Sequence, residues 1–79
     1  MQVRIRYFAA AKAAAGVADE VREAVDGCSI EALLEGAGFG GHPVFGRSSF
    51  LVNGVTAPDR KRALADGDTL DVLPPFAGG

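Results

Sequence analysis

Apolar residues recur at every second position in three short segments of the chain. In Gln2–Phe8, positions 3, 5 and 7 are apolar and positions 2, 4 and 6 are polar. Ser48–Val52 has apolar residues at positions 50 and 52, and Thr69–Leu73 has them at positions 70 and 72. Alternation with a period of two is typical of a strand with one buried face. The pattern therefore predicts three strands, each with one face toward a core.

Two other segments have the character of helices. Ala9–Ala15 is rich in alanine and is followed by Gly16, which predicts a short helical turn with a glycine stop. Ser29 is a favoured N-cap residue, and Glu31 follows in the first turn, where a carboxylate complements the helix dipole. Apolar residues at positions 30, 33 and 34 form one face of this second helix, which is predicted to end near Gly36.

Two segments are harder to interpret. In Val17–Val25, valines at positions 17, 21 and 25 have the spacing of a helical stripe, but the odd positions also suit a weak strand. Gly36–Gly46 is predicted to be a glycine-rich loop. It formally contains the G-x-G-x-x-G spacing, but a helix precedes it where a dinucleotide-binding motif requires a strand.

Turn signals separate the elements and indicate the fold class. Asn53-Gly54 predicts a tight hairpin, because a type I′ turn needs positive φ at both central residues. Asp66-Gly67-Asp68 marks another turn. A helix on one face of a small mixed sheet is the natural α+β arrangement for so few residues. If the first and last strands are adjacent, the fold is a β-grasp, with a mixed sheet of four to five strands packed on one main helix. Residues 1–73 are then expected to form the domain, and residues 74–79 a flexible, extended tail.

Composition narrows the class of protein. The chain has 79 residues, of which 48% are hydrophobic and 23% charged, as expected for one compact domain. A net charge of −2 argues against nucleic acid as the main partner. No apolar run approaches the roughly 20 residues that span a bilayer, and there is no signal-peptide pattern, so we expect no membrane association and a cytoplasmic location. A single cysteine, Cys28, excludes an internal disulfide, and one histidine without a Cys/His cluster argues against a zinc site.

Three isolated features have ordinary structural interpretations. Cys28 precedes a predicted helix N-terminus, where a thiolate would be stabilised, but no basic residue flanks it, so a small half-buried residue is favoured. His42 is predicted to be a surface residue of the loop. Arg60-Lys61-Arg62 is predicted to be a solvated turn, although such a run can also bind an anion or an acidic partner.

The sequence ends in Pro74-Pro75-Phe76-Ala77-Gly78-Gly79. Two glycines lose much entropy when ordered and bury nothing, but a glycine carboxylate can enter a channel too narrow for other residues. Extended, six residues reach roughly 20 Å. A frayed terminus is the alternative, but frayed ends are usually charged, whereas this one is apolar and stiffened by proline. We therefore interpret the tail as an arm that delivers its carboxylate to another protein.

Strand parity predicts an apolar surface beside this arm. If positions 5 and 7 face the helix, Phe8 at an even position is expected on the opposite face of the sheet. If positions 70 and 72 face the helix, Leu73 at an odd position is expected on that opposite face as well. If the two strands are neighbours, Phe8 and Leu73 form an apolar spot continuous with Phe76, which suggests a docking surface. The alternative is that either side chain turns back into the core where its strand ends.

On these residues the chain resembles the small sulfur carriers of the MoaD/ThiS type, which have the ubiquitin-like β-grasp fold, and most of all the small subunits of molybdopterin synthase. The resemblance rests on Val52-Asn53-Gly54, on Leu64-Ala65-Asp66-Gly67-Asp68 and on the Pro-Pro-Phe-Ala-Gly-Gly ending, and it extends over essentially the whole chain. It implies a second strand at Val17–Val25. The short, glycine-heavy Gly36–Gly46 departs from the family, whose members tend to have a longer helix there.

The resemblance also implies a mechanism. In this family an ATP-using adenylyltransferase, related to ubiquitin-activating enzymes, converts the terminal carboxylate to an acyl-adenylate, and a sulfur donor then displaces AMP to give a thiocarboxylate. In molybdopterin synthase, a heterotetramer, the large subunit receives the tail, and the sulfur converts cyclic pyranopterin monophosphate to the dithiolene of molybdopterin. By this resemblance Gly79 carries the chemistry, Gly78 gives the tail access, and the chain itself has no catalytic base and binds no cofactor or metal. The residues expected to bind partners are Phe8, Leu73, Pro74, Pro75 and Phe76.

Three other functions are compatible with the sequence. The chain could carry sulfur in another pathway, such as thiamin or cysteine biosynthesis, although its last six residues favour molybdopterin. It could be a ubiquitin-like modifier that is conjugated to lysines through Gly79. The fate of the acyl group separates a modifier from a sulfur carrier: a modifier forms an isopeptide bond, and a carrier forms a thiocarboxylate. It could also be a non-covalent β-grasp interaction module, for which the Gly-Gly ending is incidental.

Overall fold

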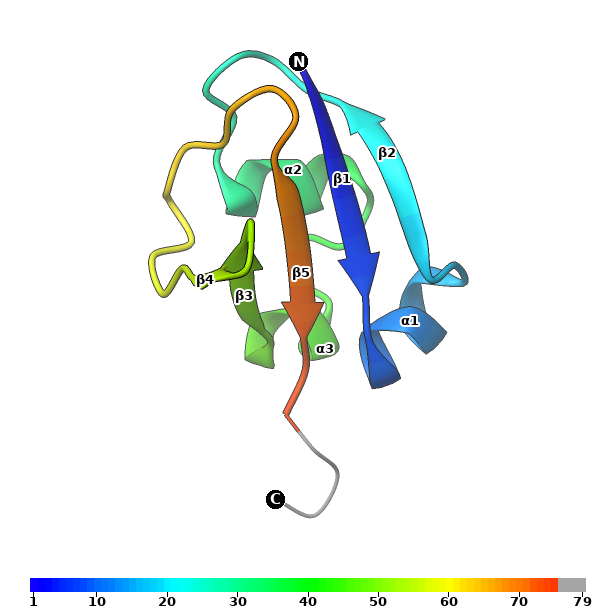
Figure 1. Ribbon diagram of the computed structural model, residues 1–79. Coiled ribbons are helices and arrows are strands. Elements are labelled where there is room, and N and C mark those ends of the chain that lie inside the picture. The colour runs from blue at the N-terminus through cyan, green and yellow to red at the C-terminus, as the bar shows by residue number, and fades with distance from the viewer. Residues whose placement is uncertain (76–79) are drawn as a thin grey trace.

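The computed structural model describes residues 1–75 as one mixed sheet covered by short helices. In chain order the elements are β1 (Gln2–Tyr7), α1 (Ala9–Ala15), β2 (Asp19–Glu23), α2 (Ile30–Gly36), α3 (Pro43–Arg47), β3 (Ser49–Val52), β4 (Val55–Thr56) and β5 (Thr69–Leu73). The sheet order is β2-β1-β5-β3-β4, with β1 and β5 parallel and the other neighbours antiparallel. Helices α2 and α3 lie behind the sheet in Figure 1. The β-grasp fold predicted from the sequence is confirmed.

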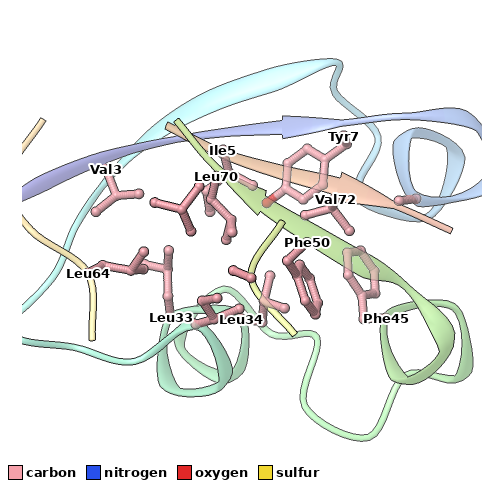
Figure 2. Packing of buried hydrophobic residues seen from close by; sticks show 14 residues of the cluster. Val3, Ile5, Tyr7, Leu33, Leu34, Phe45, Phe50, Leu64, Leu70 and Val72 are labelled. Atoms are coloured by element: carbon pink, nitrogen blue, oxygen red, sulfur yellow. The ribbon is translucent and has the colours of Figure 1, made fainter. Parts of the chain in front are cut away.

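One hydrophobic core lies between the sheet and the helices. The alternation predicted for β1 holds, since its apolar residues are buried and its polar residues exposed. In β5, Leu70 and Val72 are completely buried as predicted, but Asp71 between them is buried too. Leu33 and Leu34 of α2 face these strands across the core (Figure 2). The complete cluster is Val3, Ile5, Tyr7, Ala11, Ile30, Leu33, Leu34, Phe45, Phe50, Val52, Ala57, Leu64, Leu70 and Val72. In the described part of the chain no helix has the length and hydrophobicity that crossing a membrane would require.

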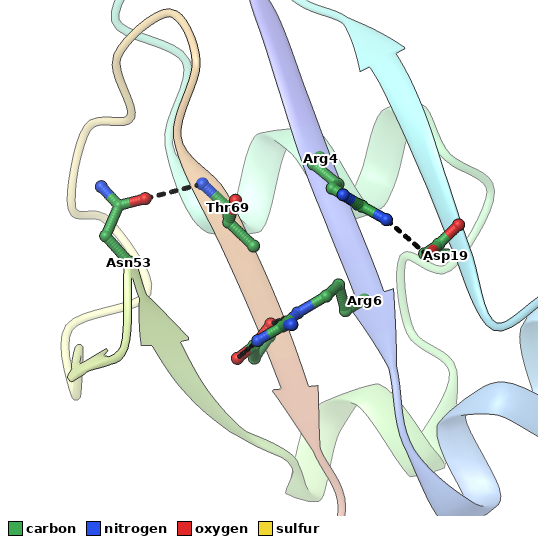
Figure 3. A network of polar contacts seen from close by, with 6 residues as sticks. Arg4, Arg6, Asp19, Asn53 and Thr69 are labelled. Atoms are coloured by element: carbon green, nitrogen blue, oxygen red, sulfur yellow. Dashed lines mark hydrogen bonds and ion pairs between the residues drawn. The ribbon is translucent and has the colours of Figure 1, made fainter.

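Local signals end the elements as the sequence predicts. The Ser29 hydroxyl accepts a hydrogen bond from the backbone N–H three residues later, at 3.1 Å, and so caps α2. Gly16 ends α1 with a φ of 80°. Asn53 and Gly54 have φ values of 51° and 81°, as a type I′ turn requires. The Asn53 side-chain oxygen also accepts from the backbone N–H of Thr69 at 2.9 Å (Figure 3), which attaches the hairpin to β5.

β2 is a strand, as the resemblance implied, but Val21 at its centre and the two valines outside its ends are exposed. The valines at positions 17, 21 and 25 are 42%, 62% and 77% exposed. On the inner side, the Tyr7 hydroxyl donates a hydrogen bond to the Glu20 carboxylate at 3.0 Å, and the Arg22 guanidinium forms an ion pair with the same carboxylate at 2.8 Å. Burial, together with the bond to Glu20, raises the pKa of Tyr7 above its ordinary value. Since β2 is an edge strand, these inward charges protect the edge against pairing with other chains.

The prediction of a loop throughout Gly36–Gly46 is wrong, because α3 begins at Pro43. His42 is the N-cap of this helix: its Nδ1 accepts from the backbone N–H two residues on, at 3.2 Å, so it is more than the surface residue predicted. Phe45 is buried, and its ring stacks on that of Phe39 with centroids 4.3 Å apart. Glycines lower the helix propensity of the segment, and the packing of these rings overrides it.

Arg60 holds α3 in place, so the prediction of a solvated turn at Arg60-Lys61-Arg62 is wrong for this residue. Its guanidinium donates to the carbonyl oxygens of residues 45, 46 and 48 at 2.9, 3.0 and 2.9 Å. The end of a helix leaves such carbonyls without their usual partners. The guanidinium carbon also lies 4.8 Å from the ring centroid of Phe50, a cation–π contact. Lys61 and Arg62 are exposed, as predicted.

Asp68 makes the stability of the segment before β5 dependent on pH. Its carboxylate accepts hydrogen bonds from the backbone N–H of Ala65 at 2.8 Å and from the Asn53 side chain at 2.9 Å. The bond from Ala65, with that from Asn53, lowers the pKa of Asp68 below its ordinary 3.8. Because the folded state has the lower pKa, this contribution to stability is complete above the ordinary value and is lost as the pH falls through the folded-state value.

We therefore expect Asp68→Asn to lower the free energy of unfolding at pH 7 by about 1 kcal/mol, because the amide can accept only one of the two bonds. The difference from the wild type should shrink on acidification below about pH 4. Urea unfolding as a function of pH measures both quantities. Glu35→Gln is the control, since Glu35 is exposed and forms no side-chain hydrogen bond or ion pair with the rest of residues 1–75. A difference between Asp68→Asn and the wild type that does not change with pH would contradict this role of the carboxylate.

Candidate functional site

The chain leaves the sheet at its centre, where β5 ends. β5 lies between β1 and β3, and Pro74-Pro75 continue it beyond Leu73 (Figure 1). Pro74 is half-buried and Pro75 is exposed. The predicted site residues Phe76, Gly78 and Gly79 lie outside the described residues. The structure therefore defines the base of the tail and the surfaces on either side of it.

On the outer face of the sheet, away from the helices, Phe8 and Leu73 form what we call the outer patch. Tyr7 and Val72 are paired across β1 and β5, and Phe8 donates its backbone N–H to the Val72 carbonyl at 3.2 Å. Tyr7 and Val72 are core residues. Leu73 follows Val72 in β5, and Phe8 follows β1 with an extended backbone, so both point to the opposite face. Phe8 is 40% exposed and Leu73 is half-buried. The two predicted docking residues thus lie beside each other at the base of the tail.

An ion pair fixes the sheet next to the outer patch. Arg6 of β1 donates two hydrogen bonds to Asp71 of β5, at 2.6 and 2.7 Å, and Asp71 is only 5% exposed. These bonds raise the pKa of the Arg6 guanidinium above its ordinary value. The same guanidinium lies 5.8 Å from the ring centroid of Phe8. Figure 3 shows Arg6 reaching across from β1 toward β5, and Arg4 paired with Asp19 at 2.9 Å farther along the face. The outer patch is therefore apolar with a charged, cross-linked border.

On the helix side of the tail base lies a concave surface, which we call the tail-base groove. It has a volume of about 160 Å³ and is lined by Ala10 of α1, by Pro43, Val44 and Arg47 of α3, and by Pro74 and Pro75. Its lining is mainly apolar, and Arg47 is its charged residue. The sequence did not predict this groove, because its lining comes from three separated segments and one of them is the unexpected helix α3.

Cys28 and His42, the cysteine and the histidine of the chain, are each engaged in local contacts. Cys28 is half-buried, and its sulfur lies 3.5 Å from the carbonyl oxygen of its neighbour Ser29. His42 is engaged as a helix cap. Within residues 1–75 no group of three or more histidine, cysteine or acidic side chains is placed to hold a metal ion. What the geometry does offer is an exit for the tail between two apolar surfaces.

The chain is similar to several known proteins over nearly its whole length. It is 36% identical to a molybdopterin synthase sulfur carrier subunit of Chlamydomonas reinhardtii, with all of both chains covered. The solved structure of molybdopterin converting factor subunit 1 of Pyrococcus furiosus matches with a TM-score of 0.78 at 29% identity, covering 96% of this chain and 99% of that one. SAMP1 from Haloferax volcanii matches with a TM-score of 0.81 at 27% identity over all of both chains. The family model described as the ThiS family matches residues 5–79, and the chain therefore belongs to the ThiS family.

Proposed function

We propose that this chain is the sulfur-carrier subunit of a molybdopterin synthase and that the carboxylate of Gly79 takes up and delivers the sulfur. The observation that carries the proposal is the 36% identity to a sulfur carrier subunit of that enzyme over the full length of both chains. The base of the tail supports it, because Pro74-Pro75 directly follow a central strand and lie beside an apolar patch.

Sulfur uptake requires activation, because a carboxylate is a poor electrophile. We propose that an ATP-using adenylyltransferase binds the tail. The Gly79 carboxylate attacks the α-phosphorus of ATP, pyrophosphate leaves, and an acyl-adenylate forms. A sulfur donor then attacks the acyl carbon, AMP leaves, and the thiocarboxylate results. ATP is bound by the partner, and the chain contributes its terminal group and, through Gly78, a tail thin enough to enter the active site.

Sulfur delivery takes place in the second partner, the large subunit of the synthase. There the thiocarboxylate sulfur attacks a carbon of cyclic pyranopterin monophosphate. Water then hydrolyses the bond between that sulfur and the Gly79 acyl carbon, which regenerates the Gly79 carboxylate, and two loaded carriers are used for each dithiolene. We propose a heterotetramer in which a central dimer of large subunits holds one copy of this chain at each end. The cytoplasm is the expected location of both steps.

The outer patch has a defined part in this proposal. Phe8 and Leu73 lie at the base of the tail, so a partner that takes in the tail also covers them. Apolar contact there contributes affinity, and Pro74-Pro75 limits the directions the tail can take, which lowers the entropy lost on binding. We propose that Phe76 continues this contact.

A protein modifier is the second candidate function, and one observation favours it. Small archaeal modifier protein 1 of Haloferax volcanii has a solved structure that matches this chain with a TM-score of 0.77 at 25% identity, covering 95% of this chain and 98% of that one. Activation of Gly79 is the same in both functions. They differ only in whether a sulfur donor or a lysine amine displaces AMP.

The intact mass of the chain distinguishes these functions. The chain, purified from its own cells, is measured before and after incubation with its adenylyltransferase, ATP and a sulfur source. We expect a gain equal to replacing one oxygen by sulfur, located on the peptide that contains Gly79. A ladder of larger conjugates would support the modifier instead. An unchanged mass, under conditions that load a known carrier, would contradict both and favour a non-covalent interaction module.

A further inference from the structure

The tail-base groove is a surface to which the mechanism above assigns no role. We propose that it binds the large subunit of the synthase by accepting an apolar side chain of that subunit, with a neighbouring carboxylate paired to Arg47. The inference rests on the proposed function and adds to it a second contact surface and the chemistry of the partner segment that fits there.

The length of the tail requires the partner to come close to the groove. Four residues follow Pro75, and fully extended they reach about 13 Å. Any protein that holds the Gly79 carboxylate in its active site must therefore bring its own surface within that distance of Pro75. Since Pro74 and Pro75 themselves line the groove, a partner surface around the tail lies next to it. The groove is thus part of the ring of surface that a tail-binding protein covers.

The lining of the groove suits an apolar side chain. Three of its six lining residues are prolines, and Ala10 and Val44 are also apolar. A volume of about 160 Å³ leaves room for one side chain. Proline and alanine side chains lose almost no conformational entropy when a partner covers them. The favourable free energy of burying their apolar surface is therefore hardly offset.

The groove is also held in shape before any partner arrives. α3, which supplies half of its lining residues, is capped at one end by His42 and held at the other by Arg60. The Ser48 hydroxyl donates to the carbonyl oxygen of Val44 at 2.8 Å, which fixes the turn that contains Val44. A preformed surface costs little ordering free energy on binding.

Charge identifies the second feature of the partner segment. Arg47 is exposed at the groove. The cations of the ion pairs within residues 1–75 are the N-terminal ammonium, Arg4, Arg6 and Arg22, and none of these pairs involves Arg47. A carboxylate on the large subunit beside the inserted side chain would complement this guanidinium. The surface therefore fits a segment with an apolar residue followed or preceded closely by an acidic one.

Two variants of the full chain test the inference, one by charge and one by shape. Arg47→Glu reverses the charge at the groove, and Ala10→Leu fills it from α1. We expect each to raise the Kd for the large subunit by roughly tenfold or more, measured by calorimetry. Added salt should weaken binding of the wild type and should strengthen binding of Arg47→Glu relative to it, because salt screens an attraction in the first case and a repulsion in the second. Arg62→Glu and Ala13→Leu are the matched controls, since both residues are exposed and neither lines the groove.

The outcomes separate this inference from the proposed function. Thermal unfolding of each variant establishes that the domain is intact. Wild-type affinity in both groove variants would overturn the groove assignment while leaving the proposed function in place. A defect confined to adenylylation would overturn it too, because the groove would then belong to the activating enzyme. A wild-type chain that fails to bind the large subunit would overturn the inference and the proposed function together.

Discussion

Adding one alanine after Gly79 is expected to reduce sulfur transfer by more than about a hundredfold and to leave the stability of the domain unchanged. The extra residue moves the terminal carboxylate by up to about 3.5 Å and adds a Cβ to it. Misplacement by about 1 Å can cost a hundredfold in rate when reacting groups must be aligned. Gly78→Val should have a comparable effect, because a branched side chain would block entry of the tail. Transfer is followed as formation of the thiocarboxylate and then of the dithiolene product.

The control for this experiment is a glycine whose substitution meets no obstacle in the domain. A Cβ added at Gly36 has no heavy atom of another segment within 4 Å, so Gly36→Val tests whether loss of any glycine harms the protein. We expect it to transfer sulfur at nearly the wild-type rate. If the chain extended beyond Gly79 still transfers sulfur normally, the Gly79 carboxylate is not the group that carries it, and the mechanism proposed above is wrong.

The central strands and the hairpin could be predicted because local rules and tertiary structure agree there. In β1, every second residue is apolar, and the same residues are buried, so parity alone identifies the faces of the strand. Parity also places Phe8 and Leu73 on the outer face, since the neighbouring Tyr7 and Val72 belong to the core. Asn53-Gly54 has one favoured turn geometry, and the chain adopts it.

Prediction fails where a contact between distant segments decides the structure. The inner face of β2 is polar because Tyr7 and Arg22 both bond Glu20, and no periodicity of the valines reveals such a network. α3 forms within a glycine-rich segment because Phe45 is buried and Arg60, from another loop, binds the carbonyls at its end. The tail-base groove could not be predicted for the same reason, since α3 supplies half of its lining.

Among the residues that the sequence places on the surface, Arg60 is therefore the one whose substitution should lower the free energy of unfolding most. We expect Arg60→Ala to lower the free energy of unfolding by about 2–3 kcal/mol, since three bonds to backbone carbonyls and a cation–π contact with Phe50 are lost. For a domain of this size that corresponds to a fall in Tm of roughly 10 °C or more. Arg62→Ala, at an exposed position of the same loop, should change the free energy by less than about 0.5 kcal/mol.

The variant Arg60→Lys separates the contribution of the three hydrogen bonds to stability from that of the positive charge. A lysine keeps the positive charge, but its ammonium is a compact point and cannot bridge three carbonyls as the planar guanidinium does, so the stability should fall between those of Arg60→Ala and the wild type. Urea unfolding gives the three free energies, and amide hydrogen exchange of residues 43–48 reports whether α3 loosens first. Because α3 supplies the wall of the tail-base groove, a loosened α3 should weaken binding of the large subunit even at temperatures where the domain stays folded. Equal stability of Arg60→Ala and Arg62→Ala would show that the guanidinium does not hold α3 and that the groove is not preformed in this way.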